Sequence, residues 1–231
     1  MVELMQEAGE WVEGEVKVRG RLRERVEEWV RIGANPVVVE WIRNGITIEI
    51  KGDIHPGRES IPLTEEQQMW VQQELQRACR VGAIEMVSQD EIAARVKLVS
   101  PVFVVPKKGP KKYRLVHDLR GLNVAVPDRP VKMETLSTLA RMAGKEWWMV
   151  TFDLAQGYHH LEMHSEAAKF LGFRFQGRMY RYMVLPFGLK TAPAIFTKVV
   201  REMVKALRKM GVHLISYIDD FCIVAPSQEE A

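Results

Sequence analysis

Three carboxylates at the ends of apolar, β-rich segments constrain the fold of this chain more than any other feature. An acidic turn, Asp219–Asp220, separates β-rich runs over 213–217 and 221–225, and Asp153 lies near the end of an apolar strand predicted over 147–154. Carboxylates crowded in an apolar setting repel one another unless a divalent cation lies among them. If these elements are neighbouring strands, Asp153 and Asp219 converge on metal ions. On spacing alone, an ordinary turn and a strand-end cap remain the alternative.

The rest of the chain alternates predicted helices and strands. Thr64 opens a helix, because Thr-Glu-Glu-Gln forms a capping box, and Gly82 ends that helix. Hydrophobic periodicity predicts four strands and two further helices: strands over 102–105, 113–119, 170–175 and 179–185, and helices over 133–142 and 191–210. We therefore expect an α+β fold in which an antiparallel sheet carries the three aspartates and the last two helices lie behind it.

The first part of the chain differs in character from the remainder. Residues 1–60 are expected to form a helical or extended leader that precedes a main domain over 61–231. Alternating charges among the apolar residues of 16–30 predict a solvated amphipathic helix. Residues 51–62 are rich in Gly, Pro and Ser and predict a linker or an extended crossing loop.

The net charge of +3 conceals an uneven distribution of charge along the chain. Residues 1–100 carry 13 basic and 18 acidic side chains, whereas residues 101–231 carry 20 basic and 12 acidic ones. Much of the positive excess lies in 101–130, around the lysine-rich turn 106–112. The second half is therefore the expected binding surface for a polyanion.

Several classes of protein are disfavoured by composition and pattern. No apolar run approaches the roughly 20 residues that a bilayer span requires, and the acidic N-terminus has no signal-peptide core. The two cysteines show no zinc-ligand spacing. We therefore expect an intracellular protein, in cytoplasm or nucleus, with no membrane partner and no structural zinc.

Four segments, in this order, resemble the fingers and palm of a reverse transcriptase. They are LVSPVFVVPKKGPKKYRLVHDLRGLN (98–123), VTFDLAQGYHH (150–160), LPFGLKTAPAIF (185–196) and YIDD (217–220). Their wording is closest to retrotransposon enzymes of the Gypsy and DIRS types. The segment 29–50 also resembles the leader of DIRS-like polymerases, though far less specifically.

The resemblance implies roles for the residues that match the family's motifs. Asp153 and Asp219 would be metal ligands, with Asp220 as the second carboxylate of the turn. Tyr158 falls where the family keeps an aromatic ring beneath the nucleotide sugar, a ring that would clash with a ribose 2′-hydroxyl. An ordinary core tyrosine is the alternative.

Further residues match the nucleotide-binding parts of the family. Arg114 and one of Lys107 or Lys108 fall where the family clamps the triphosphate, although a solvated basic loop remains an alternative. Phe187 and Gly188 would pack against the new base pair and the sugar, and Phe187 replaces the glutamine usual in retroviral enzymes. The other candidates have structural explanations: Asp118 and Arg120 as an ion pair bracing the fingers, with a template contact as the alternative, and His159 and His160 as packing residues, with metal ligation as the alternative.

The function implied is RNA-directed DNA polymerisation by a two-metal mechanism, with Mg²⁺ as the expected ion and Mn²⁺ as an alternative. The partners would be an RNA or DNA template-primer, deoxynucleoside triphosphates and remaining polyprotein domains, such as a thumb, an RNase H, a recombinase or an integrase. The sequence stops at Ala231, shortly after the acidic turn, so thumb and RNase H are expected to be absent. A second hypothesis is therefore a truncated, non-processive fragment that acts only as a nucleic-acid-binding or partner-binding module. A metal-dependent nuclease is a weaker third.

Overall fold

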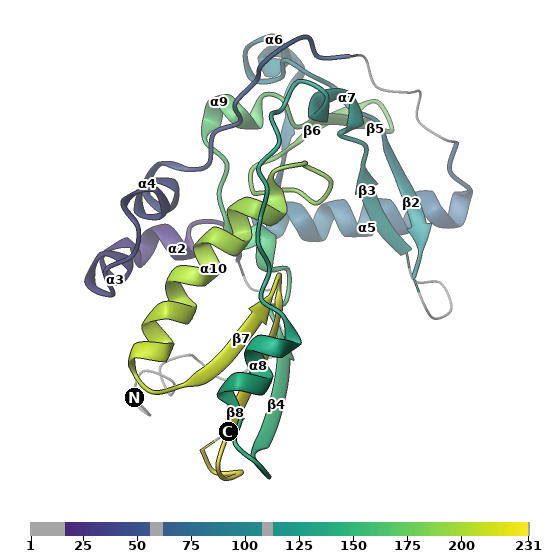
Figure 1. The fold of residues 1–231 in the computed structure, drawn as a ribbon. Helices are drawn as coiled ribbons and strands as arrows, with labels where there is room; N and C mark the ends of the chain where they lie inside the picture. The colour runs from purple at the N-terminus through teal and green to yellow at the C-terminus, as the bar shows by residue number, and fades with distance from the viewer. Residues whose placement is uncertain (1–16, 56–61, 108–112, 231) are drawn as a thin grey trace.

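The computed structural model describes residues 17–55, 62–107 and 113–230, and their strands form three small antiparallel sheets (Figure 1). The strands are β1 (Ile84–Val87), β2 (Val102–Pro106), β3 (Tyr113–His117), β4 (Trp148–Asp153), β5 (Gly172–Phe175), β6 (Arg178–Tyr182), β7 (His213–Tyr217) and β8 (Asp220–Ala225). The helices are α2 (Arg21–Glu24), α3 (Val26–Arg31), α4 (Pro36–Asn44), α5 (Glu65–Arg80), α6 (Ile92–Arg95), α7 (Arg120–Asn123), α8 (Leu136–Met142), α9 (Ser165–Ala168) and α10 (Ala192–Lys209). Two short 3-10 turns, η1 (Gln89–Glu91) and η2 (Gly157–His160), complete the set.

The sheet β4–β8–β7 carries the acidic residues, as the sequence predicted. Helices α10 and α8 pack against β7, and Figure 1 shows both beside this sheet. The apolar stripe of α10, which includes Ile195, Phe196 and Val199, is buried because it repeats at helical spacing on one face. Helix α8 begins at Leu136, so the prediction of a start at Met133 was three residues too early.

The sheet β4–β8–β7 with its helices forms one lobe. The second sheet, β1–β6–β5, and the separate hairpin β2–β3 form the other lobe (Figure 1). Strand β1 was not predicted, because its four residues lie directly after α5 and show no alternation of their own. The run predicted to extend to Leu185 leaves the sheet after Tyr182, since the amide of Leu185 donates instead to the carbonyl of Leu161 at 2.8 Å. The capping box at Thr64 is confirmed, and Val71 and Leu75 on α5 are buried.

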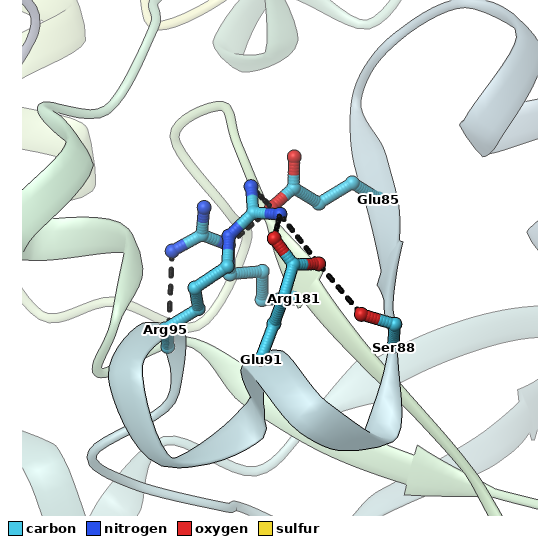
Figure 2. Close-up of polar contacts among 5 residues, drawn as sticks. All are labelled: Glu85, Ser88, Glu91, Arg95 and Arg181. Atoms are coloured by element: carbon cyan, nitrogen blue, oxygen red, sulfur yellow. Dashed lines mark hydrogen bonds and ion pairs between the residues drawn. The ribbon is translucent and has the colours of Figure 1, made fainter.

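A network of salt bridges connects the η1–α6 turn to the β1–β6–β5 sheet (Figure 2). The side chain of Arg181 is only 5% exposed, and its Nε donates to Glu85 Oε1 at 2.5 Å. The same carboxylate oxygen accepts from Arg95 at 2.6 Å, and Arg95 also pairs with Glu91 at 3.2 Å. Ser88 Oγ donates to Glu91 at 2.7 Å, so one chain of contacts runs from the sheet to the turn.

The leader is helical, but it forms three short helices and not the single solvated helix expected over 16–30. The chain turns at Arg25, between α2 and α3, and then Asn35 caps α4 by accepting from the amide of Val37 at 3.0 Å. Val38 and Ile42 of α4 belong to the same hydrophobic cluster as α5 and α10. The domain boundary near residue 60 stays a prediction, and part of the expected linker, 56–61, lies outside the described residues.

Within the described residues, none of the helices combines the length and apolar character that crossing a bilayer demands. Cys79 and Cys222 are both free and partly buried. Burial raises the pKa of both thiols, so they are weak nucleophiles at neutral pH.

Candidate active site

One pocket of about 560 Å³ collects most of the residues singled out from the sequence. It opens between α5, the β2–β3 hairpin, η2 and the β7–β8 turn. The predicted residues on its wall are Lys107, Arg114, Tyr158, Phe187 and Asp219. Positive side chains therefore enter from the hairpin, aromatic rings from the region of η2, and a carboxylate from the β4–β8–β7 sheet.

The three aspartates meet at one end of the β4–β8–β7 sheet. Asp153 and Asp220 are directly opposite each other in the antiparallel β4–β8 pair, so both side chains project from the same face. The amide of Leu154 donates to the carbonyl of Asp219 at 3.0 Å, which fixes the turn against the end of β4. Asp219 lines the main pocket, whereas Asp153 and Asp220 line an adjoining hollow of about 530 Å³.

The turn between β7 and β8 is held in an unusual backbone conformation. Ile218 has a φ of 58°, in the left-handed region that β-branched residues rarely adopt. Such a conformation costs about 1–3 kcal/mol and persists only where the surroundings enforce it. Here Ile218 packs against the hydrophobic cluster and lines the pocket beside Asp219. The hairpin thus presents Asp219 and Asp220 in two different directions.

Tyr158 forms the centre of an aromatic group at the floor of the pocket. It is only 6% exposed and stacks on Phe187, with ring centroids 4.7 Å apart, while Phe196 of α10 approaches its ring at 4.9 Å. Gly157 permits this approach, because a Cβ there would lie 2.8 Å from Phe196. Burial, with a smaller contribution from the Asp219 charge, raises the pKa of Tyr158 to about 12, so its hydroxyl stays neutral.

The loop that carries Phe187 and Gly188 is clamped from α7. The side chain of Asn123 donates to the carbonyl of Gly188 at 2.7 Å and accepts from the amide of Lys190 at 2.8 Å. Gly188 has a φ of 93°, and a Cβ would lie 3.0 Å from the carbonyl oxygen of His117. Glycine is therefore required by conformation and by space. Phe187 itself is 52% exposed, so one side of its ring remains open.

The cationic candidates lie on both strands of the β2–β3 hairpin. Arg114 is opposite Val105 in the β2–β3 register, and Lys107 directly follows β2. Lys108 lies outside the described residues, so the choice between the two lysines stays open. The predicted ion pair is confirmed, since Arg120 contacts both carboxylate oxygens of Asp118, at 2.8 and 2.5 Å.

Sequence reasoning missed the wall that α5 contributes. Trp70, Glu74 and Arg77 share one face of the helix and line the pocket, with Arg77 paired to Glu74. Their spacing reveals a common face, but a single sequence gives no signal that this face meets the acidic turn. His159 lines the same pocket; burial and the nearby Arg77 charge lower its pKa to about 4. His159 and His160 are partly buried, and His159 packs against Tyr182 and Phe187, which fits the packing role expected of it.

The carboxylates supply only part of a metal coordination shell. Across residues 17–55, 62–107 and 113–230, no group of three or more His, Cys, Asp or Glu side chains is arranged to hold a metal ion. Mg²⁺ commonly binds through one or two protein carboxylates and completes its shell with substrate phosphates and water. Aspartates placed beside a pocket lined by Lys107 and Arg114 fit that mode, in which the substrate brings the remaining ligands.

The antiparallel sheet ends in paired aspartates, is backed by helices and is faced by a basic hairpin. This arrangement defines the palm and fingers of a polymerase of the right-hand type. The chain belongs to the reverse transcriptase (RNA-dependent DNA polymerase) family, whose sequence model matches residues 105–231. The crystal structure of prototype foamy virus protease-reverse transcriptase superposes with a TM-score of 0.66 at 22% identity, over 80% of this chain and 23% of that one. The expected α+β polymerase fold is thereby confirmed.

Sequence relatives point to transposable elements. The chain is 36% identical over 136 residues to the retrovirus-related Pol polyprotein from transposon 297 of Drosophila melanogaster, covering 57% of this chain and 13% of that polyprotein. It is 31% identical over 137 residues to the corresponding polyprotein from transposon gypsy of the same organism, covering 57% and 13%. The predicted resemblance to a retrotransposon reverse transcriptase is confirmed, and the chain spans only a small part of the length of these relatives.

Proposed function

We propose that this chain forms the nucleotide-binding and catalytic centre of an RNA-directed DNA polymerase, which adds deoxynucleotides to a primer under the direction of a template. The observation that carries the proposal is the single pocket that joins Lys107, Arg114, Tyr158, Phe187 and Asp219. A nucleoside triphosphate needs cations for its phosphates, an apolar surface for its sugar and base, and carboxylates for its metal ions. The pocket offers the cations, the apolar surface and the carboxylate of Asp219 on different walls, and Asp153 and Asp220 line the hollow beside it.

Each wall has a distinct role in this proposal. Lys107 and Arg114 would bind the triphosphate, where charge-assisted hydrogen bonds are strongest. Tyr158 would lie beneath the sugar and leave no space for a 2′-hydroxyl, and Phe187, held by Asn123, would contact the base pair. The family motifs and the placement of the side chains around one pocket support these roles.

Asp153, Asp219 and Asp220 would hold the divalent ions. Two bound Mg²⁺ ions, with Mn²⁺ as an alternative, would supply the acidification of the primer hydroxyl and the neutralisation of phosphate charge. The protein's own contribution is positional, because the β4–β8 register and the strained Ile218 turn fix where the carboxylates lie. Remaining domains of a polyprotein, including a thumb, would complete the grip on the template-primer.

The decisive experiment is primer extension by the 231-residue chain with the Asp219→Asn substitution. On a primed RNA template with Mg²⁺, extension should fall by more than 100-fold, because the neutral amide cannot replace a carboxylate ligand. Glu229→Gln, an exposed acidic residue of the same lobe, is the matched control and should extend normally. Unchanged extension by the Asp219→Asn variant contradicts the site. Binding without any extension by the unmodified chain would favour the binding-module hypothesis.

A further inference from the structure

A second groove, separate from the polymerase pocket, lies between the leader and the palm. It has a volume of about 570 Å³, and its walls come from α4, from the connector 129–132 and from α10. It shares no lining residue with the pocket that holds Tyr158 and Asp219. In Figure 1 the connector from α7 to α8 crosses α10, and α4 is seen to the left of that helix. The α4 wall precedes the range that the family model matches.

The charge of the groove is strongly positive. Its lining contains five cationic side chains, Arg129, Lys132, Lys198, Arg201 and Lys205, but only one carboxylate, Glu202. That carboxylate is already engaged: its side chain is 7% exposed, and it accepts from Lys205 at 2.8 Å and from the amide of Asn35 at 3.2 Å. Glu202 therefore links α10 to the start of α4 but does not neutralise the remaining cations of the groove.

Three of these cations lack an acidic partner. Lys132, Lys198 and Arg201 have no carboxylate within 4.0 Å in the described part of the chain. Arg129 has a loose contact with Glu49, at 3.7 Å. Unpaired cations gathered on one concave surface raise the local positive potential, because each charge adds to the field of the others. A groove with this composition is complementary to a polyanion.

An aromatic side chain lies among the cations. Trp41 of α4 lines the groove, and Lys198 Nζ lies 5.2 Å from the centre of its ring. Grooves that bind single-stranded nucleic acid combine cations, which follow the backbone, with aromatic rings, on which unpaired bases stack. A duplex does not expose its base faces to such a ring.

We infer that this leader-palm groove binds a single strand of nucleic acid, with Lys132, Lys198 and Arg201 on its phosphates and Trp41 against a base. The inference rests on the proposed function, because the strand is that of a template that the polymerase copies. α10 connects the two sites: Phe196 contacts Tyr158 in the polymerase pocket, while Lys198 and Arg201 face the groove. A strand held there would be anchored to the helix that supports the nucleotide pocket.

The test is fluorescence anisotropy of the full chain with a labelled 20-nucleotide single strand, dT20, over a range of salt concentrations. The double variant Lys198→Gln with Arg201→Gln keeps part of each aliphatic stem and removes both charges. We expect its affinity to fall roughly tenfold near 0.1 M salt. The slope of log affinity against log salt should become shallower by about 1.4, from roughly 0.7 per phosphate contact on a single strand.

Matched controls separate the groove from general charge. Arg174→Gln with Lys209→Gln removes two exposed cations that line neither pocket, and its affinity should stay within about twofold. Trp41→Leu keeps apolar volume but removes the indole, and it should bind roughly tenfold more weakly, whereas Trp41→Phe should stay near the original affinity. Thermal unfolding of each variant checks that the fold is retained.

Two results would overturn the inference. One is dT20 binding by the Lys198/Arg201 double variant with unchanged affinity and salt slope. The other is an equal loss of affinity for a blunt 20-base-pair duplex, which would show an unspecific basic surface. The catalytic proposal is judged separately, because Asp219→Asn should abolish extension while leaving dT20 binding intact. If the groove inference fails, dT20 binding by the Lys198/Arg201 double variant is unchanged. If the catalytic proposal fails, primer extension by Asp219→Asn is unchanged.

Discussion

At the scale of single residues, Tyr158 has the most specific environment in the pocket. Its ring is enclosed by Phe187 and Phe196, so it cannot swing away to admit a bulkier sugar without breaking both contacts. Its hydroxyl lies near the charge of Asp219, and the raised pKa keeps it a neutral hydrogen-bond donor. Rigidity and position, more than acidity, are therefore what this residue offers to sugar selection.

The first prediction concerns this ring. Tyr158→Val should lower the preference for deoxynucleotides over ribonucleotides roughly 10- to 100-fold, because the smaller side chain leaves space for a 2′-hydroxyl. Steady-state incorporation of matched dNTP and rNTP on one primed template measures the ratio. Tyr158→Phe retains the ring and is the control, with selection near that of the original chain. An unchanged ratio for Tyr158→Val would contradict sugar exclusion and leave Tyr158 as a core residue.

At the scale of elements, the loop 186–190 depends on α7, a helix of only four residues. Asn123 spans the gap with one donor and one acceptor, and Lys190 adds contacts to the carbonyl of Val126 at 3.0 Å and to Asp128 at 2.9 Å. The loop is thus held by polar contacts at its C-terminal side. Phe187, nearer its other side, makes ring contacts with Tyr158 and His159.

The second prediction follows from this clamp. Asn123→Ala removes two hydrogen bonds worth about 1 kcal/mol each. We expect the nucleotide KM to rise roughly tenfold while kcat changes less, since under the proposed function the loop would bind the nucleotide without touching the reacting atoms. Asn123→Asp keeps the acceptor for Lys190 and loses the donor to Gly188. Its KM should therefore lie between that of the original chain and that of Asn123→Ala. Equal KM values for all three chains would show that the clamp does not position Phe187.

The same elements show how far the sequence alone could lead. The strands other than β1, the long helices and the acidic hairpin follow from hydrophobic period and turn residues, which act over neighbours along the chain. The left-handed Ile218 and the α5 face bearing Trp70 and Arg77 follow from contacts between distant segments. The split of the three aspartates between two adjoining hollows also depends on the exact course of the turn. No local pattern encodes such contacts.

At the scale of the whole molecule, the leader is joined to the palm by packing and by charge. Ile46 donates its amide to the carbonyl of Glu162 at 2.8 Å, and its side chain is 1% exposed. The carboxylate of Glu162, 7% exposed, faces Arg19 and Arg23 at 3.2 Å each. These contacts occur a few residues after Tyr158, so the leader supports the segment that carries the pocket floor.

The third prediction tests this junction by the free energy of unfolding in urea. Arg19→Ala with Arg23→Ala leaves the Glu162 carboxylate buried without its cations, and we expect a loss of about 2–3 kcal/mol, at the low end for a buried pair because both arginines are partly exposed. Adding Glu162→Gln to that double variant should recover about 1 kcal/mol or more, because a neutral amide costs less to bury than an unpaired charge.

Whether stability is recovered distinguishes two ways in which the leader could be attached. If the ion pairs hold the leader, removing the stranded charge restores stability, and Glu162→Gln alone costs less than loss of both arginines. If packing by Val38, Ile42 and Ile46 dominates, the free energy of unfolding of each variant should lie within about 0.5 kcal/mol of that of the original chain. In the first case the α4 wall of the basic groove should also loosen when the arginines are removed, and affinity for dT20 should fall together with stability.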